Sequence, residues 1–169
     1  MSGRPLEWAR IGVFERAKRA CGEASCGLGA ACDLRFASEE ARFSIPEVDL
    51  GIPLAWGGIP RLVREIGPAL TKELVLTCRP FDAAEAKAAG FLNRVVPAAV
   101  LDAEVDEFAA SLAKKARYAI TATKRHVNAV TDQMVGTGRS WSDADGLVNG
   151  FQDPECSQAR RDYLASRGK

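Results

Sequence analysis

Residues 43–53 constrain the fold of this 169-residue chain more than any other segment. In residues 42–45, polar and large apolar side chains alternate, which is the pattern of a half-buried β-strand. Pro46 then ends the strand, because proline has no N–H group to donate to a neighbouring strand. Glu47 comes next, and the glycine-rich turn 56–58 follows. The pattern predicts a short strand with the carboxylate of Glu47 just beyond its end.

Small residues and a second strand pattern precede this segment. Residues 27–31 are mainly glycine and alanine, which predicts a helix packed closely against its neighbours. Residues 34–36 alternate in the manner of a strand, and residues 38–40 predict the turn that leads from it to residues 42–45.

Helical patterns dominate the rest of the chain. Pro60 suits the first turn of a helix over residues 61–66, and Gly67 with Pro68 ends that helix. Further helices are predicted over about residues 69–77, 83–89, 101–116, 118–130 and 154–167, with a short strand over residues 92–96.

Two acidic residues mark helix starts. Asp82, followed by Glu85, predicts a capping box that opens the helix over residues 83–89. Asp153 predicts an N-cap for the last helix. Both predictions rest on the short side chain of aspartate, whose oxygen can accept a hydrogen bond from a backbone N–H group at a helix start.

Composition excludes several classes of function. The chain carries 23 basic and 22 acidic side chains, so its net charge of +1 gives no reason to expect nucleic acid or an anionic membrane as a partner. No apolar run is long enough to cross a bilayer, and the charges within residues 1–20 leave no room for a secretory leader. We therefore expect a cytoplasmic protein without membrane partners.

The cysteines and the histidine predict no metal site. Five cysteines occur without a CxxC pair, and His126 is the single histidine. An odd number of cysteines argues against a disulfide framework, and the five cysteines with the single histidine do not match the ligand spacing of zinc sites. We expect reduced thiols and no metal.

Four segments, taken in chain order, resemble the crotonase (enoyl-CoA hydratase/isomerase) family. They are residues 32–38 (CDLRFAS), residues 43–51, residues 79–96 and residues 123–125 (TKR), and the resemblance covers the chain from about Gly27 to its C-terminus. It implies an α/β fold, part of the ClpP/crotonase-like spiral of ββα units, with a helical C-terminal region. It also implies an acyl-CoA thioester as substrate, no cofactor beyond the coenzyme A of that substrate, and a homotrimer or dimer of trimers.

The resemblance assigns roles to particular residues. Glu47 falls on the family's acid/base glutamate, whereas the second glutamate of the hydratases falls on Gly27. The oxyanion-hole glycine falls near Ala24, next to the negative charge of Glu23. In the family, two backbone N–H groups hold the enolate oxygen of the thioester while a carboxylate moves a proton. With one carboxylate, proton shuttling between neighbouring carbons is the more natural reaction.

The glycine-rich turn is expected to lie beside the substrate. Trp56 is either a wall of the acyl pocket or a core or interface side chain, and Gly57 serves the backbone geometry near the ligand. Lys124 with Arg125 would meet coenzyme A phosphates or would face solvent. Asp33 is read as a structural cap.

The resemblance also divides the chain. Residues 1–25 do not resemble the family, residues 26–100 form a partial crotonase core, and residues 101–169 form a helical oligomerisation region. We expect an N-terminally truncated or frame-disrupted member of the family. The alternatives are an active enoyl-CoA hydratase/isomerase and an inactive remnant or non-catalytic subunit. Thioester hydrolysis or decarboxylation is a further alternative within the active class.

Overall fold

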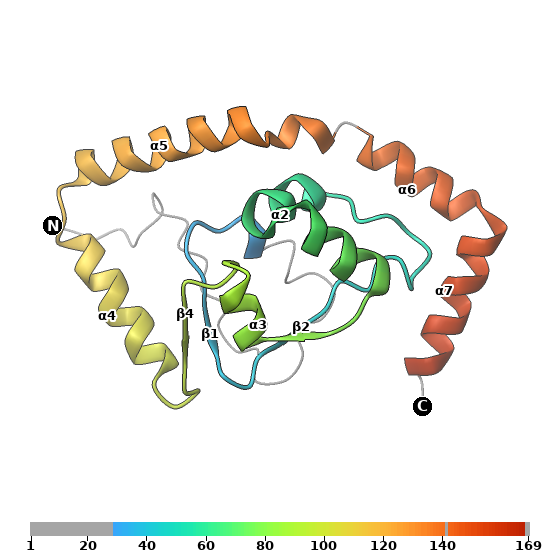
Figure 1. Cartoon of the computed structure of the whole chain (residues 1–169), viewed down its shortest axis with the longest axis horizontal. Coiled ribbons are helices and arrows are strands. Elements are labelled where there is room, and N and C mark those ends of the chain that lie inside the picture. Colours follow the sequence, from blue (N-terminus) through green and yellow to red (C-terminus); the bar gives the residue numbers. More distant parts are fainter. Residues whose placement is uncertain (1–28, 141, 168–169) are drawn as a thin grey trace, which may run out of the picture.

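The C-terminal helices form an arc around a small α/β core. Figure 1 shows this arrangement in a computed structural model, which describes residues 29–140 and 142–167. The first described residues, Gly29 and Ala30, are helical and buried, as the small residues of this segment predicted. The predictions for residues 1–25, for Ala24 and for Gly27 lie outside the described residues.

Two small sheets lie at the centre of the core. Strand β1 (Phe36–Ser38) pairs in parallel with β4 (Arg94–Val96), and β2 (Arg42–Phe43) pairs antiparallel with β3 (Phe81–Asp82). Both predicted strands form, but the first lies two residues later than the predicted residues 34–36, and the second is two residues long instead of residues 42–45. Although they are neighbours in sequence, each pairs with a segment about 40 or more residues away. For β1 and β4 the long connection is required, because a parallel pair needs a crossover.

Helix α2 (Gly58–Thr77) contains a kink. Gly67 has φ 77° and ψ 164°, which lie outside the helical region, and Pro68 follows it. Proline within a helix removes one hydrogen bond and clashes with the preceding turn, so the axis bends here. Two helical segments separated by Gly67-Pro68, as predicted, are confirmed.

Helix α3 (Ala83–Ala88) begins at its predicted cap. Asp82 accepts a hydrogen bond from the backbone N–H of Glu85 at 2.8 Å. The carboxylate of Glu85 in turn accepts a hydrogen bond from Nη1 of Arg79 at 3.0 Å, and this interaction lowers the pKa of Glu85. The cap and the ion pair together tie the start of α3 to the segment that follows α2.

Acid is expected to weaken this connection. Because the folded state lowers the pKa of Glu85, the pair stabilises the fold fully above the ordinary value of 4.5 and loses its effect as pH falls through the lower folded value. Between neutral pH and pH 3, the free energy of unfolding measured in urea should therefore fall more steeply for the wild type than for Glu85→Gln. The difference should shrink at high salt, because the pair is partly exposed. Parallel pH curves for the two proteins would refute this linkage.

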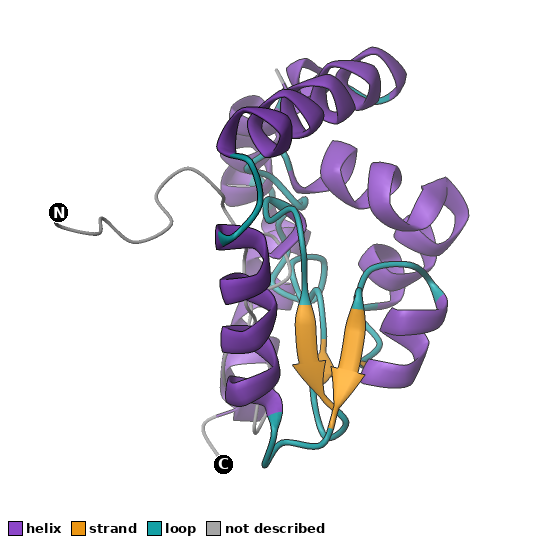
Figure 2. Cartoon of the chain, turned by 90° about the vertical axis from the view of Figure 1, so that its left-hand side faces the viewer, coloured by secondary structure: helices purple, strands orange, loops and turns teal. Residues whose placement is uncertain are grey.

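Four helices and a short 3₁₀ segment follow β4. They are α4 (Leu101–Ala113), α5 (Arg117–Met134), η1 (Thr137–Ser140), α6 (Asp143–Gln152) and α7 (Pro154–Arg167). Figure 2 shows α4 alongside the parallel strands, where Phe108 packs on Phe36 with ring centroids 5.1 Å apart. Helix α7 begins behind Asp153, which accepts the N–H of Cys156 at 2.9 Å and so acts as the predicted N-cap. Helix α6 was not predicted.

The core is formed by α2, α3 and the strands. Phe43 stacks on Phe81 with centroids 5.3 Å apart and meets Phe91 edge-on at 6.2 Å. Leu62 and Leu74 of α2 are almost fully buried beside them. By contrast, α5 has no buried residue, so much of its apolar surface stays in contact with solvent. Within the described ranges, no helix combines the length and apolar character that crossing a membrane requires.

Candidate functional site

Glu47 lies in a tightly hydrogen-bonded turn that follows the segment after β2. The N–H groups of Leu50, Gly51 and Ile52 donate to the carbonyls of Pro46, Val48 and Glu47 at 3.0, 2.9 and 3.0 Å, respectively. Ile45, just before the turn, is 2% exposed and anchors it in the core. Glu47 itself is only 5% exposed. Glutamate is rarely buried to this degree unless it is paired or functional.

The glycine-rich turn forms the N-terminal end of α2. Trp56 is 69% exposed, so it is not a core residue. Its left-handed φ of 55° is a strained conformation for a bulky residue. Gly57 is the N-cap of α2, with φ 67°. Its N–H donates to Oδ2 of Asp143 in α6 at 2.7 Å. Arg61 donates to the carbonyls of Trp56 and Gly57 at 2.8 and 3.1 Å.

An open pocket of about 460 Å³ lies beside this turn. Trp56, Gly57 and Arg61 line one side of it, and Ser140 and Asp143 line the other. The pocket thus brings together the two predicted substrate-binding residues and the charged side chains of Arg61 and Asp143, which are far apart in the sequence. An arginine and a carboxylate at an apolar tryptophan can bind a ligand that carries both polar and apolar parts.

A larger groove of about 760 Å³ lies between residues 31–34 and α2 on one side and α5 with the end of α4 on the other. Asp33 and Lys124 form an ion pair across it, with their side chains 30% and 29% exposed. Asp33 therefore neutralises the charge of Lys124, one of the two basic residues considered for phosphate binding. The other, Arg125, is exposed.

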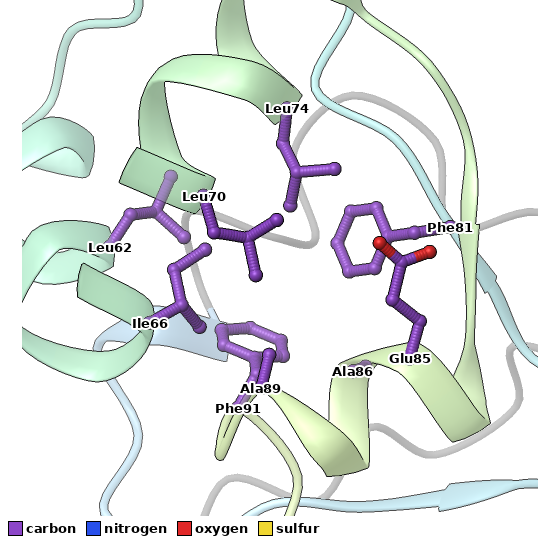
Figure 3. A pocket seen from close by; sticks show the side chains of 9 residues that line it. All are labelled: Leu62, Ile66, Leu70, Leu74, Phe81, Glu85, Ala86, Ala89 and Phe91. Carbon is purple, nitrogen blue, oxygen red and sulfur yellow. The ribbon is translucent and has the colours of Figure 1, made fainter. Parts of the chain in front are cut away.

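A third cavity lies inside the core. Figure 3 shows its lining from α2 on one side and from α3, Phe81 and Phe91 on the other. Its volume of about 10 Å³ could hold at most one water molecule, so it is a packing gap rather than a substrate site.

The structure brings together some predicted site residues and not others. Trp56 and Gly57 share the open pocket, whereas Glu47 lines none of the three cavities described above. Ala24 and Gly27 lie outside the described residues. Across residues 29–140 and 142–167, no three His, Cys, Asp or Glu side chains are grouped as a metal site.

Sequence reasoning missed three residues that organise this region. Asp143 caps the turn at Gly57, and Arg61 holds its carbonyls. Arg160 of α7 donates to the carbonyl of Leu50, in the turn of Glu47, at 3.3 Å. For Asp143 the available signal was the pair Ser142-Asp143, residue types that are common at helix starts, and α6 begins there although no helix was predicted. Nothing local indicated its partner, which lies 86 residues away.

Comparison with known proteins gives a consistent result over most of the chain. Residues 19–167 match the family model described as "Enoyl-CoA hydratase/isomerase". The short-chain-enoyl-CoA hydratase of Clostridioides difficile is 41% identical over 113 residues, which cover 67% of this chain and 73% of that protein.

Solved structures match at the level of the fold as well. A putative enoyl-CoA hydratase from Streptomyces avermitilis superposes with a TM-score of 0.76 at 35% identity, over 86% of this chain and 52% of that one. Methylmalonyl-CoA decarboxylase in complex with 2-nitronate-propionyl-CoA gives a TM-score of 0.69 at 25% identity, over 81% and 53%. The chain spans about half the length of these structures and of most of the curated relatives that it matches.

Proposed function

Since this chain belongs to the enoyl-CoA hydratase/isomerase family, with a partial crotonase-like α/β fold and a mainly helical C-terminal region, we propose that it acts on an acyl-CoA thioester. In this proposal the thioester carbonyl oxygen is held by backbone N–H groups and Glu47 moves a proton on the acyl chain. Such donors stabilise the negative charge that develops on the oxygen when a neighbouring carbon loses a proton.

The setting of Glu47 is the main support for its role. Its turn is hydrogen-bonded at three successive N–H groups, and its side chain is almost fully buried. A general acid/base must be held still and shielded from bulk water, and a rigid buried turn meets both needs. We assign Ala24 to the oxyanion hole. Gly27, which supplies no carboxylate, favours an isomerase-type proton transfer over water activation by two glutamates.

Trp56 and Gly57 are proposed to contact the substrate through the open pocket beside α2. The exposed indole offers apolar surface to an acyl chain or a flat ring system. The nearby Arg61 and Asp143 would orient polar groups.

We further propose that the chain acts as an oligomer, a trimer or a dimer of trimers. Exposed apolar side chains gather on α5, which has no buried residue. Tyr118, Val127, Val130 and Met134 are 86%, 55%, 46% and 74% exposed. Apolar surface of this kind on a soluble domain often marks a protein interface.

One observation favours a second candidate, a non-catalytic member of the family. Glu47 lines none of the three cavities described above, so neither of the two substrate-sized ones adjoins its carboxylate. The likeness to methylmalonyl-CoA decarboxylase also keeps decarboxylation as an alternative reaction of the same fold.

Binding of acyl-CoA is the test that separates these candidates. The purified chain should bind butyryl-CoA, a saturated thioester that cannot undergo hydration, with a saturable heat signal in isothermal titration. Light scattering on the same sample should give a defined oligomer. Free coenzyme A is the matched control, and it should bind more weakly because it lacks the acyl group. A soluble, folded chain that binds neither ligand would contradict the proposed function and support the non-catalytic candidate.

A further inference from the structure

The turn that carries Glu47 packs directly against α6 and α7, which meet at a bend on the right-hand side of Figure 1. Gly51 has a left-handed φ of 67°, and a Cβ added to it would lie 2.7 Å from the carbonyl carbon of Cys156. On the other side, a Cβ added to Gly150 would lie 3.2 Å from the carbonyl oxygen of Gly51. The two helices therefore hold the backbone of the turn between them, at a separation that only glycine at position 51 permits.

Arg160 of α7 connects the same turn to α6 through its guanidinium group. Nε donates to the carbonyl of Leu50 at 3.3 Å, and Nη2 lies 3.5 Å from the carbonyl of Gly150. The latter belongs to the last turn of α6, where carbonyls lack partners within the helix. The guanidinium also lies over the ring of Phe151, 4.4 Å from its centroid, which restricts its position further.

Movement of Leu50 and Gly51 would be transmitted to Glu47 through the turn itself. Ile52 donates its N–H to the carbonyl of Glu47, and Leu50 donates to the carbonyl of Pro46. These bonds span the peptide units on both sides of Glu47. A displacement of the turn away from α7 would therefore reorient the Glu47 backbone and, with it, the carboxylate.

We propose that Arg160 is a positioning residue for Glu47, because it holds the turn of residues 47–51 against α6 and α7. Arg160 acts through the backbone of the turn and contacts no substrate. Its effect on turnover rests on the proposed function of Glu47, whereas its effect on the turn does not. A misplacement of about 1 Å at a reacting group can lower a rate by about a hundredfold, so a clamp of this kind can matter for activity.

The test compares Arg160→Met with Arg161→Met in the full chain. Arg161 is exposed on the same helix and binds Gln158, so its replacement controls for loss of one α7 arginine. In hydrogen exchange read by mass spectrometry, Arg160→Met should speed exchange in residues 46–53 about tenfold and leave the α2 core unchanged. Arg161→Met should resemble the wild type. With crotonyl-CoA as substrate, Arg160→Met should lower kcat about tenfold or more at a nearly unchanged KM.

The outcomes separate this inference from the proposed function. Faster exchange confined to residues 46–53 supports the positioning role even if the wild type turns over no substrate. Unchanged exchange there overturns it, whatever the activity, as does exchange that rises equally throughout the chain. If Arg160→Met does not fold, Arg160→Lys replaces it. A lysine reaches one carbonyl instead of two, so exchange should rise about threefold, and an unchanged rate again overturns the inference.

Gly51→Ala tests the same contact without changing a charge. Gly90→Ala is its matched control, because Gly90 also has a left-handed φ, 84°, but an added Cβ would only meet the carbonyl oxygen of Glu65 at 3.7 Å. Both variants pay the cost of the left-handed backbone, and only Gly51→Ala should also separate α7 from the turn. Faster exchange in residues 154–167 of Gly51→Ala alone supports the clamp. Equal exchange in both variants refutes it.

Discussion

Replacement of Glu47 by Gln is expected to lower the turnover of an enoyl-CoA substrate by about a hundredfold to ten-thousandfold. Glutamine has nearly the shape of glutamate but cannot take up and release a proton at neutral pH. Because Glu47 is 5% exposed and packed in its turn, the isosteric change should leave the fold and the Kd for butyryl-CoA nearly unaltered. Steady-state kinetics and titration of the same samples would measure both quantities.

Glu40→Gln provides the matched control for this experiment. Glu40 lies in the exposed turn between β1 and β2, so its replacement removes one negative charge without touching the candidate site. We expect wild-type turnover from this variant. Retention of wild-type kcat by Glu47→Gln would remove Glu47 from the mechanism, and loss of ligand binding would point to a structural role instead.

Replacement of Arg35 by Met is expected to lower the free energy of unfolding by about 3–5 kcal/mol. Arg35 is 3% exposed and forms an ion pair with Glu65 of α2. It also donates to the carbonyl of Cys32 at 2.7 Å and to that of Phe91, and its guanidinium lies over the Phe91 ring. One side chain thus joins the helix end before β1, helix α2 and the segment before β4. Methionine fills similar space but leaves these buried polar groups without their donor.

Urea unfolding followed by circular dichroism would measure this loss. Since small domains are commonly stable by only about 5–15 kcal/mol, Arg35→Met is expected to unfold at much lower urea or to be unfolded from the start. Arg42→Met is the control, because Arg42 is exposed and its side chain donates to the carbonyl of its neighbour Ala41. Its effect should stay within about 0.5 kcal/mol. Equal midpoints for the two variants would show that the Arg35 contacts contribute little to stability.

Local signals accounted for much of the secondary structure. Asp82 and Asp153 cap the helices that they were expected to cap, and the break at Gly67-Pro68 lies where predicted. Each of these features depends on residues within one helical turn, so a single sequence is enough to reveal it. The helix ends were less accurate: the helix predicted to reach residue 116 ends at Ala113.

Helix α6 was missed for a physical reason. Its sequence contains Gly146 and Gly150, which lower helix propensity, so no element was predicted over these residues. In the folded chain both glycines face the segment 51–53, where an added Cβ would lie 3.2 Å from Pro53 or from the carbonyl of Gly51. Close packing against that segment outweighs the unfavourable propensity. The strand pairing of β1 with β4 was hidden for a similar reason, because no local pattern names a partner 58 residues away.

The sequence by itself determined the family, the capped and kinked helices, and the position of Glu47 behind a proline, because those properties are encoded in residue type and short spacing. Only the tertiary structure decided which distant groups meet: Asp143 with Gly57 across 86 residues, Arg160 with Leu50 across 110, and Arg35 with Glu65 across 30. Such contacts depend on how whole elements pack, and many side chains of the same type could form them. The cavities depend on that packing too, which is why the burial of Glu47 away from all three could not be foreseen.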